Sequence, residues 1–198
     1  GYGGPRPNGR GPLRFPAAAP VNLYPFGCGF GRSRVGNESC MEQGLSRLKR
    51  PSDSLCFLGT PVAIGRRSVR AFGYSVGAVL VTRDGQVFTG YSRETAPDNH
   101  AEEETILKAE QAGATLEGAT IYSSMEPCST RRSKPRSCSA QIIDRRMKRV
   151  VFAVREPDRF VRCRGEQLLR DAGIEVCVLE SLAKQALEAN AHILSGQS

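Results

Sequence analysis

The chain has 198 residues, of which 39% are hydrophobic and 24% charged, the balance of a globular protein with room for one domain and a tail. No segment approaches the ~20 consecutive apolar residues of a membrane-spanning helix, and no short repeat suggests a collagen-like or coiled-coil chain. The formal net charge of +8 is a first functional hint, because basic proteins often bind phosphate groups.

The first 60 residues differ from the rest in composition. They contain 11 of the 21 glycines and 7 of the 12 prolines, with eight Lys/Arg against three Asp/Glu. Because this stretch has no hydrophobic periodicity, we predict a disordered Gly/Pro/Arg-rich tail over residues 1–60 and a folded domain over residues 61–198. A cytoplasmic location is expected, and the acid-poor, Arg-containing start leaves organellar targeting open as an alternative.

Strands and helices are predicted to alternate along the folded domain. Val-rich and β-branched runs between turn residues predict five strands, namely Tyr74–Thr82, Gln86–Tyr91, Ala119–Ser124, Arg149–Val154 and Ile174–Leu179. Amphipathic segments predict four helices, namely His100–Gln111, Ser137–Arg146, Gly165–Ala172 and Leu182–Leu194. The first two strands form a hairpin, and helical crossovers between the others predict an α/β fold with a mostly parallel sheet and helices on both faces.

Local residues set the expected helix boundaries. Gly59, Pro61 and Gly65 interrupt any helix ahead of the first strand. Small polar residues are expected to cap two helices, either Asp98 or Asn99 at the first and either Ser137 or Ser139 at the second.

The cysteines indicate a metal site rather than disulfides. Their number, seven, is odd, and no secretory signal accompanies them. His100 and Cys138 each begin a predicted helix, and Cys128 follows the third strand. One imidazole and two thiolates leave the fourth position of a tetrahedral zinc open to water, which is typical of a catalytic site, whereas a structural site would need a fourth protein ligand.

Glu102 is the candidate proton carrier, because it lies two residues from a predicted ligand without being needed as one. Glu103 and Glu104 are expected on a solvated face of the same helix. Glu126 is expected either to brace the metal loop or to accept a backbone hydrogen bond.

Residues from about Tyr74 to Leu194 resemble the cytidine deaminase superfamily, and within it the pyrimidine deaminase domain of riboflavin biosynthesis. The motifs that carry the resemblance are Val76–Val79, His100–Glu102, Met125–Cys128, Arg149–Val151, Glu156–Asp158 and Ala172–Ile174, with Asn190 near the end of the domain. The nine residues between Cys128 and Cys138 also resemble the long interval of that branch, whereas most cytidine and tRNA adenosine deaminases have two residues there.

The resemblance implies a three-layer α/β/α sandwich built on a five-stranded mixed sheet. It also implies a zinc-dependent deaminase of an aminopyrimidine nucleotide or nucleoside, which is either riboflavin-pathway-like or related to cytidine and dCMP deaminases, and which associates as a homodimer or homotetramer. The chain departs from the family at Tyr74-Ser75, where Asn-Pro is usual, and at Cys163-Arg164-Gly165, where Gly-x-Gly is usual. No reductase domain follows before Ser198, which predicts a stand-alone deaminase.

A basic loop lies between the two cysteine ligands. Its four cationic side chains, which either bind a substrate phosphate or form a solvated loop, are Arg131, Arg132, Lys134 and Arg136. Deamination of a base in RNA or single-stranded DNA is the alternative function, and it would need stacking aromatic residues near the site. None lies between Ser124 and Arg149, which favours a small pyrimidine nucleotide or nucleoside over nucleic acid.

Overall fold

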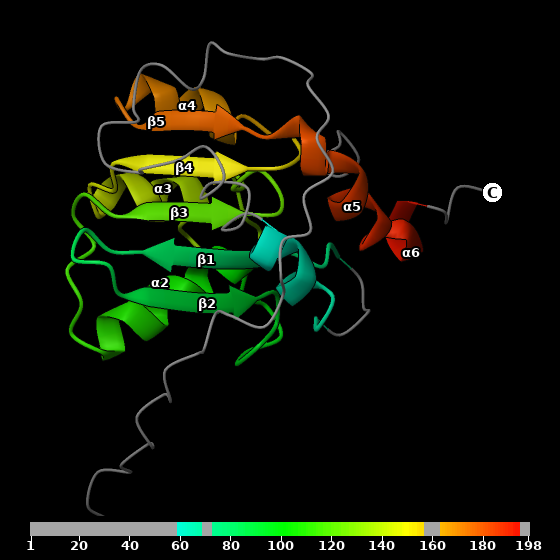
Figure 1. The fold of residues 1–198 in the computed structure, drawn as a ribbon, viewed down its shortest axis with the longest axis horizontal. Coiled ribbons are helices and arrows are strands. Elements are labelled where there is room, and N and C mark those ends of the chain that lie inside the picture. Colours follow the sequence, from blue (N-terminus) through cyan, green and yellow to red (C-terminus); the bar gives the residue numbers. More distant parts are fainter. Residues whose placement is uncertain (1–58, 69–72, 157–162, 195–198) are drawn as a thin grey trace, which may run out of the picture. The chain divides into compact units, whose positions relative to one another are not determined.

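The computed structural model describes residues 59–68, 73–156 and 163–194, so the predicted tail lies outside the described residues apart from its last two positions (Figure 1). Five strands form one sheet: β1 Gly77–Val81, β2 Val87–Tyr91, β3 Thr120–Ser123, β4 Arg149–Phe152 and β5 Glu175–Val178. The helices after β2 are α2 Ala101–Gln111, α3 Cys138–Asp144, α4 Gly165–Asp171, α5 Ala183–Glu188 and α6 Ala191–Leu194, with a 3-10 turn at Glu180–Leu182. None of the helices in this part of the chain combines the length and apolarity that a membrane crossing needs.

The sheet has the strand order β2-β1-β3-β4-β5 and is mixed, as predicted. β1 is antiparallel to both β2 and β3, whereas β3, β4 and β5 run parallel. The expectation of a mostly parallel sheet was wrong, since only half of the pairings are parallel. The physical reason is that the chain crosses from β2 over β1 through α2 before it forms β3. β1 therefore lies between β2 and β3 and runs opposite to both.

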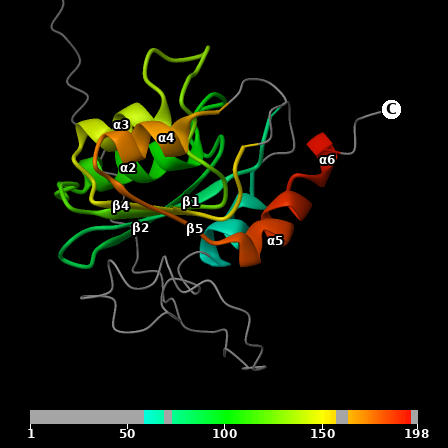
Figure 2. The same ribbon diagram turned by 90° about the horizontal axis from the view of Figure 1, so that it is seen from above.

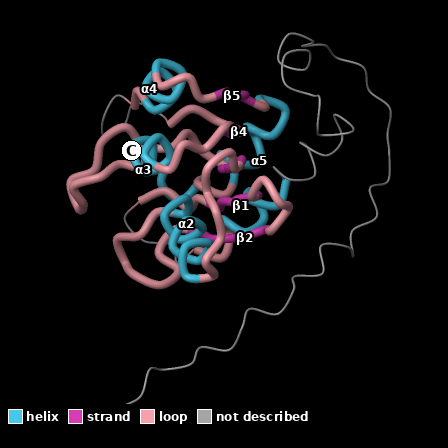
Figure 3. Tube along the Cα trace, turned by 90° about the vertical axis from the view of Figure 1, so that its left-hand side faces the viewer, coloured by secondary structure: helices cyan, strands magenta, loops and turns pink. Residues whose placement is uncertain are grey.

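Helices cover both faces of the sheet, which confirms the three-layer architecture. Figure 2 shows α2, α3 and α4 on one side and α5 with the helical segment 59–65 on the other, and Figure 3 shows the same strands between these helices from the side. Because side chains alternate along a strand, neighbours such as Leu80 and Val79 enter two different cores. The first core includes Ile106, Ile121, Val150 and Leu169, and the second includes Val62, Tyr122, Val151 and Ala186.

The helical segment 59–65 packs directly against β1, although its glycines and proline predicted no helix. Pro61 is tolerated because the N–H groups of a first helical turn need no intrahelical acceptor. A Cβ at Gly77 would lie 2.0 Å from the carbonyl oxygen of Pro61, and one at Gly65 would lie 2.9 Å from the nitrogen of Gly77. Glycine at both positions therefore lets the two backbones touch.

The predicted helix Leu182–Leu194 is broken between α5 and α6, at Asn190. Its side chain is 1% exposed, and Oδ1 accepts a hydrogen bond from the backbone N–H of Ser75 at 2.6 Å. Nδ2 donates to the carbonyl oxygens of Ser75 at 3.1 Å and Ala186 at 2.9 Å. One amide side chain thus ties the C-terminal helices to the segment that leads into β1.

Candidate active site

The candidate site forms where α2 and α3 begin, beyond the end of β3. His100 is the N-cap residue of α2 and makes no side-chain capping bond, so the expected caps Asp98 and Asn99 were wrong. Ser137 caps α3, and its side chain accepts from the backbone N–H of Ala140 at 3.2 Å. Cys138 is the first residue of α3 and is fully buried. The two helix starts therefore bring a histidine and a cysteine from distant parts of the sequence together.

The three predicted ligands form one cluster. Nδ1 of His100 lies 3.5 Å from Sγ of Cys128 and 3.5 Å from Sγ of Cys138. Around tetrahedral zinc, with bonds of about 2.0–2.1 Å to nitrogen and 2.3 Å to sulfur, a nitrogen and a sulfur ligand lie about 3.6 Å apart. Both nitrogen–sulfur distances consequently match those around a tetrahedral zinc. Within the described residues no fourth His, Cys, Asp or Glu joins the cluster, as a catalytic site requires.

Electrostatics in the cluster favour a thiolate at Cys128. The hydrogen bond between the cysteines lowers the pKa of Cys128 and raises that of Cys138, and the backbone N–H of Cys138 also donates to Sγ of Cys128 at 3.3 Å. Burial alone would lower the pKa of His100, but the hydrogen bond and charge of Cys128 outweigh it and raise this pKa. One thiolate is therefore already favoured before a metal binds.

Glu102 lies in the first turn of α2 and is 3% exposed. Its Oε1 accepts a hydrogen bond from Oγ of Ser123 at 2.7 Å, which fixes the orientation of the carboxyl group. Burial raises its pKa, so the protonated form is accessible at a higher pH than in water. A carboxyl group in this environment can both accept and donate a proton.

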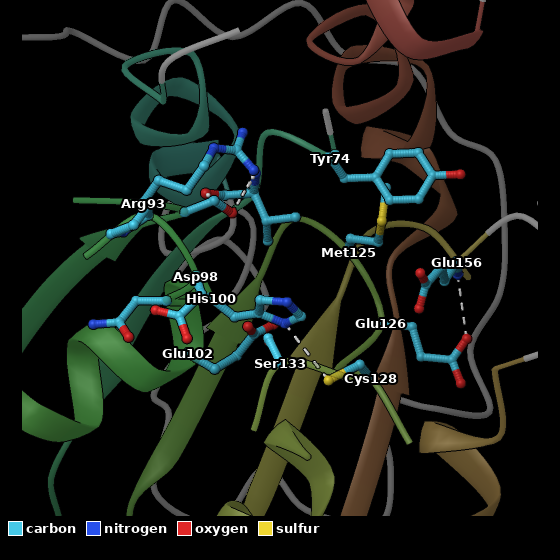
Figure 4. Close-up of a pocket in the computed structure, with 15 residues that line it drawn as sticks. Tyr74, Arg93, Asp98, His100, Glu102, Met125, Glu126, Cys128, Ser133 and Glu156 are labelled. Atoms are coloured by element: carbon cyan, nitrogen blue, oxygen red, sulfur yellow. Dashed lines mark hydrogen bonds between the residues drawn. The ribbon is translucent and has the colours of Figure 1, made fainter. Parts of the chain in front are cut away.

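A pocket of about 340 Å³ opens onto these groups, within the size range of small-molecule sites (Figure 4). His100, Glu102 and Cys128 line it. Among the other residues that line it, Tyr74, Arg93, Met125 and Glu156 were not predicted as site residues. In the sequence, Tyr74 departs from the family pattern and Glu156 begins a motif shared with the family, so both could have been singled out. Nothing in the sequence marked Arg93.

Glu126 also lines this pocket, and its carboxylate bonds to backbone rather than to the metal loop. It accepts from the N–H groups of Glu156 at 3.3 Å and Glu166 at 2.8 Å. Of the two roles expected for Glu126, the structure therefore shows the backbone hydrogen bond.

Glu156 is a titratable residue of the pocket wall, and burial raises its pKa to about 7.

The four loop cations are absent from the residues that line the pocket. Arg131 and Lys134 form ion pairs with Glu103, Arg136 pairs with Asp144, and Arg132 is exposed. Their contact with substrate stays a prediction.

The solvated face expected at Glu103 and Glu104 was wrong, because these residues are only 8% and 1% exposed. The basic loop covers Glu103. Thr95 lies against Glu104, and Oε1 of Glu104 accepts a hydrogen bond from the backbone N–H of Thr95 at 2.9 Å.

Comparison with known proteins gives consistent matches. Residues 58–154 match the family model of the cytidine and deoxycytidylate deaminase zinc-binding region. A diaminohydroxyphosphoribosylamino-pyrimidine deaminase of Schizosaccharomyces pombe is 47% identical over 114 residues, which are 57% of this chain and 28% of that protein. The chain thus spans less than a third of the length of this curated relative.

Solved structures agree in fold. A diaminohydroxyphosphoribosylaminopyrimidine deaminase/5-amino-6-(5-phosphoribosylamino)uracil reductase of Thermotoga maritima superposes with a TM-score of 0.63 at 25% identity, over 72% of this chain and 41% of that one. The Rib2 deaminase of Aspergillus oryzae in complex with DARIPP gives 0.59 at 27% identity, over 69% of this chain and 88% of that one.

Proposed function

Because the chain belongs to the cytidine deaminase-like superfamily, we propose that it is a zinc-dependent hydrolytic deaminase of an aminopyrimidine nucleotide or nucleoside. The observation that carries this proposal is that Nδ1 of His100 lies 3.5 Å from Sγ of both Cys128 and Cys138, beside the buried carboxyl group of Glu102. We assign the three as zinc ligands and Glu102 as the catalytic acid and base.

The substrate class follows from the relatives and from the pocket. We favour a diaminohydroxyphosphoribosylaminopyrimidine-type nucleotide, since the Schizosaccharomyces relative carries that name and the Aspergillus relative binds DARIPP. Asp98 and Glu156 offer acceptors for amino groups along the pocket, and Arg93 offers a cation. Deamination of RNA or single-stranded DNA receives less support, because most of the basic loop is already paired with carboxylates.

The chemistry replaces an exocyclic amino group with a carbonyl oxygen and releases ammonia. Bound zinc would supply the Lewis acid that makes water nucleophilic near neutral pH. Glu102 would accept the proton of the attacking water and pass it to the departing amine, and its raised pKa suits both directions of transfer. The Ser123 hydroxyl keeps Oε1 in one orientation during this exchange.

Ammonia release from a substrate panel tests the proposal. The panel contains the aminopyrimidine ribotide, cytidine, deoxycytidine monophosphate and guanine, and we expect turnover of the ribotide. Glu102→Gln should retain about one zinc per chain and lose on the order of 10²–10⁴-fold in kcat. A folded wild-type protein without zinc, or full activity of Glu102→Gln, contradicts the assignment.

Three further points remain predictions that rest on the sequence. The division into a tail over residues 1–60 and a deaminase domain over residues 61–198 is the first of these predictions. Association as a homodimer or homotetramer follows only from the family resemblance. A cytoplasmic location, with organellar targeting as the alternative, likewise depends on the composition of residues 1–60.

A further inference from the structure

A partly buried group of charges lies beside the cluster of candidate metal ligands, and we call it the Glu103 cluster: Glu103, Arg131 and Lys134. Oε2 of Glu103 accepts from Nη1 of Arg131 at 2.8 Å, and Oε1 accepts from Nζ of Lys134 at 2.9 Å. The Arg131 side chain is 2% exposed and that of Glu103 is 11% exposed. Both carboxylate oxygens of one α2 residue are thus occupied by cations from the loop between the cysteines.

The same two cations also hold the chain on the other side of His100. Nη2 of Arg131 donates to the carbonyl oxygen of Asp98, and Nζ of Lys134 donates to Oδ1 of Asn99. The loop is therefore bonded both to residues immediately before His100 and to a residue three positions after it. These contacts connect the backbone that carries the imidazole ligand to the loop that joins the two thiolate ligands.

The charge balance of the cluster points away from substrate binding. Burial alone would raise the pKa of Glu103, but the hydrogen bonds from Arg131 and Lys134 outweigh it, so this pKa lies below its usual value. The carboxylate is consequently ionised and neutralises part of the loop's positive charge. A buried ion pair that loses one partner leaves an uncompensated charge in the interior, which makes these residues sensitive to substitution.

We propose that the Glu103 cluster is a set of positioning residues for the metal site, which holds the loop 129–137 against α2 and thereby sets the spacing between His100 and the two cysteines. The inference rests on the proposed zinc site, and it assigns Arg131 and Lys134 to metal positioning in place of substrate contact. Residues that orient metal ligands typically change metal affinity by about 10–100-fold when they are mutated.

The test measures zinc itself. Zinc-loaded Glu103→Gln, which keeps the side-chain shape and removes the charge, is mixed with a chromogenic chelator without substrate. We expect zinc release at least about tenfold faster than from the wild-type protein. Cobalt(II)-loaded protein should also show an altered tetrahedral absorption band, a signature that reports ligand geometry directly.

Two controls separate metal positioning from general stability. Arg136→Gln breaks an exposed ion pair in the same loop and should leave zinc release unchanged. Glu104→Gln alters a carboxylate of the same helix that is buried still deeper and bonded to Thr95, so it should lower the melting temperature without faster zinc release.

Unchanged zinc release and an unchanged cobalt spectrum in Glu103→Gln would overturn the proposal. The proposal would also be overturned if the only defect of Glu103→Gln were a KM that rises for phosphorylated substrate and not for unphosphorylated substrate. The cations would then bind the substrate. A wild-type protein that binds zinc but deaminates nothing in the panel would instead refute the proposed function and leave this test intact.

Discussion

Asn190 provides a sharp test of how the C-terminal helices support the pocket. In Asn190→Ala, three hydrogen bonds disappear, and the N–H and carbonyl groups of Ser75 lose their side-chain partner in a position that is 2% exposed. At about 1 kcal/mol for each bond, with a further cost for buried groups left unsatisfied, the free energy of unfolding should fall by about 3–4 kcal/mol. For a chain of this size that corresponds to a loss of roughly 10 °C in melting temperature.

The same substitution should affect substrate binding more than chemistry. Tyr74 and Val76 flank Ser75 and both line the pocket, whereas the Asn190 side chain does not contact the metal cluster. We therefore expect KM to rise by roughly tenfold with little change in kcat.

Thermal unfolding of the zinc-loaded protein and steady-state kinetics on the same preparation measure both effects. Gln185→Ala, which removes an exposed amide from α5, should change neither. If Asn190→Ala melts within about 2 °C of the wild type, the estimate of one kcal/mol per bond is refuted here. A fall in kcat with an unchanged KM would refute the link to the pocket wall.

Two other substitutions test the packing and the pocket charge. Gly77→Ala would place a methyl group 2.0 Å from the carbonyl oxygen of Pro61 and should lower the free energy of unfolding by about 3 kcal/mol or more. Gly59→Ala is the control, because a Cβ there meets open space, and it should be neutral or stabilising. Equal melting temperatures of the two variants would contradict this expectation. Burial raises the Glu156 pKa from 4.5 to about 7, so the folded state binds the proton more tightly than the unfolded state, and the wild type loses stability as pH rises across this range. The unfolding free energy of Glu156→Gln, relative to that of the wild type, should therefore rise by about 1 kcal/mol between pH 5.5 and pH 8, after allowance for solvent screening. Denaturant titrations at several pH values measure this difference, and a difference that does not change with pH would exclude titration of Glu156 as its cause.

The cluster of candidate zinc ligands could be predicted from the sequence because zinc chemistry restricts the residue types strongly. Few side chains bind zinc. His100 and Cys138 lie at the starts of α2 and α3, and Cys128 lies in the loop that follows β3. The hydrophobic runs likewise located all five strands. These are properties of short segments, which a sequence displays directly.

The errors have a common physical origin in contacts between distant segments. Nothing in the local sequence of α2 indicates that a loop some thirty residues later covers Glu103. The helix at 59–65 forms despite its proline because β1 offers a glycine at position 77 for close packing. Similarly, the break at Asn190 is fixed by Ser75, which is 115 residues away.

The loop between the cysteines shows why charge in a sequence is weak evidence about a binding partner. A run of four cations predicts phosphate binding only if the cations lack carboxylate partners, and such partners come from other elements. Arg131 and Lys134 share Glu103, and Arg136 pairs with Asp144. Because the Arg131 side chain is almost entirely buried, a phosphate could reach it only by breaking its ion pair with Glu103 in the interior, which is costly. These three paired cations are therefore weak evidence for an ionic attraction to nucleic acid, because binding a phosphate would compete with carboxylates that they already contact.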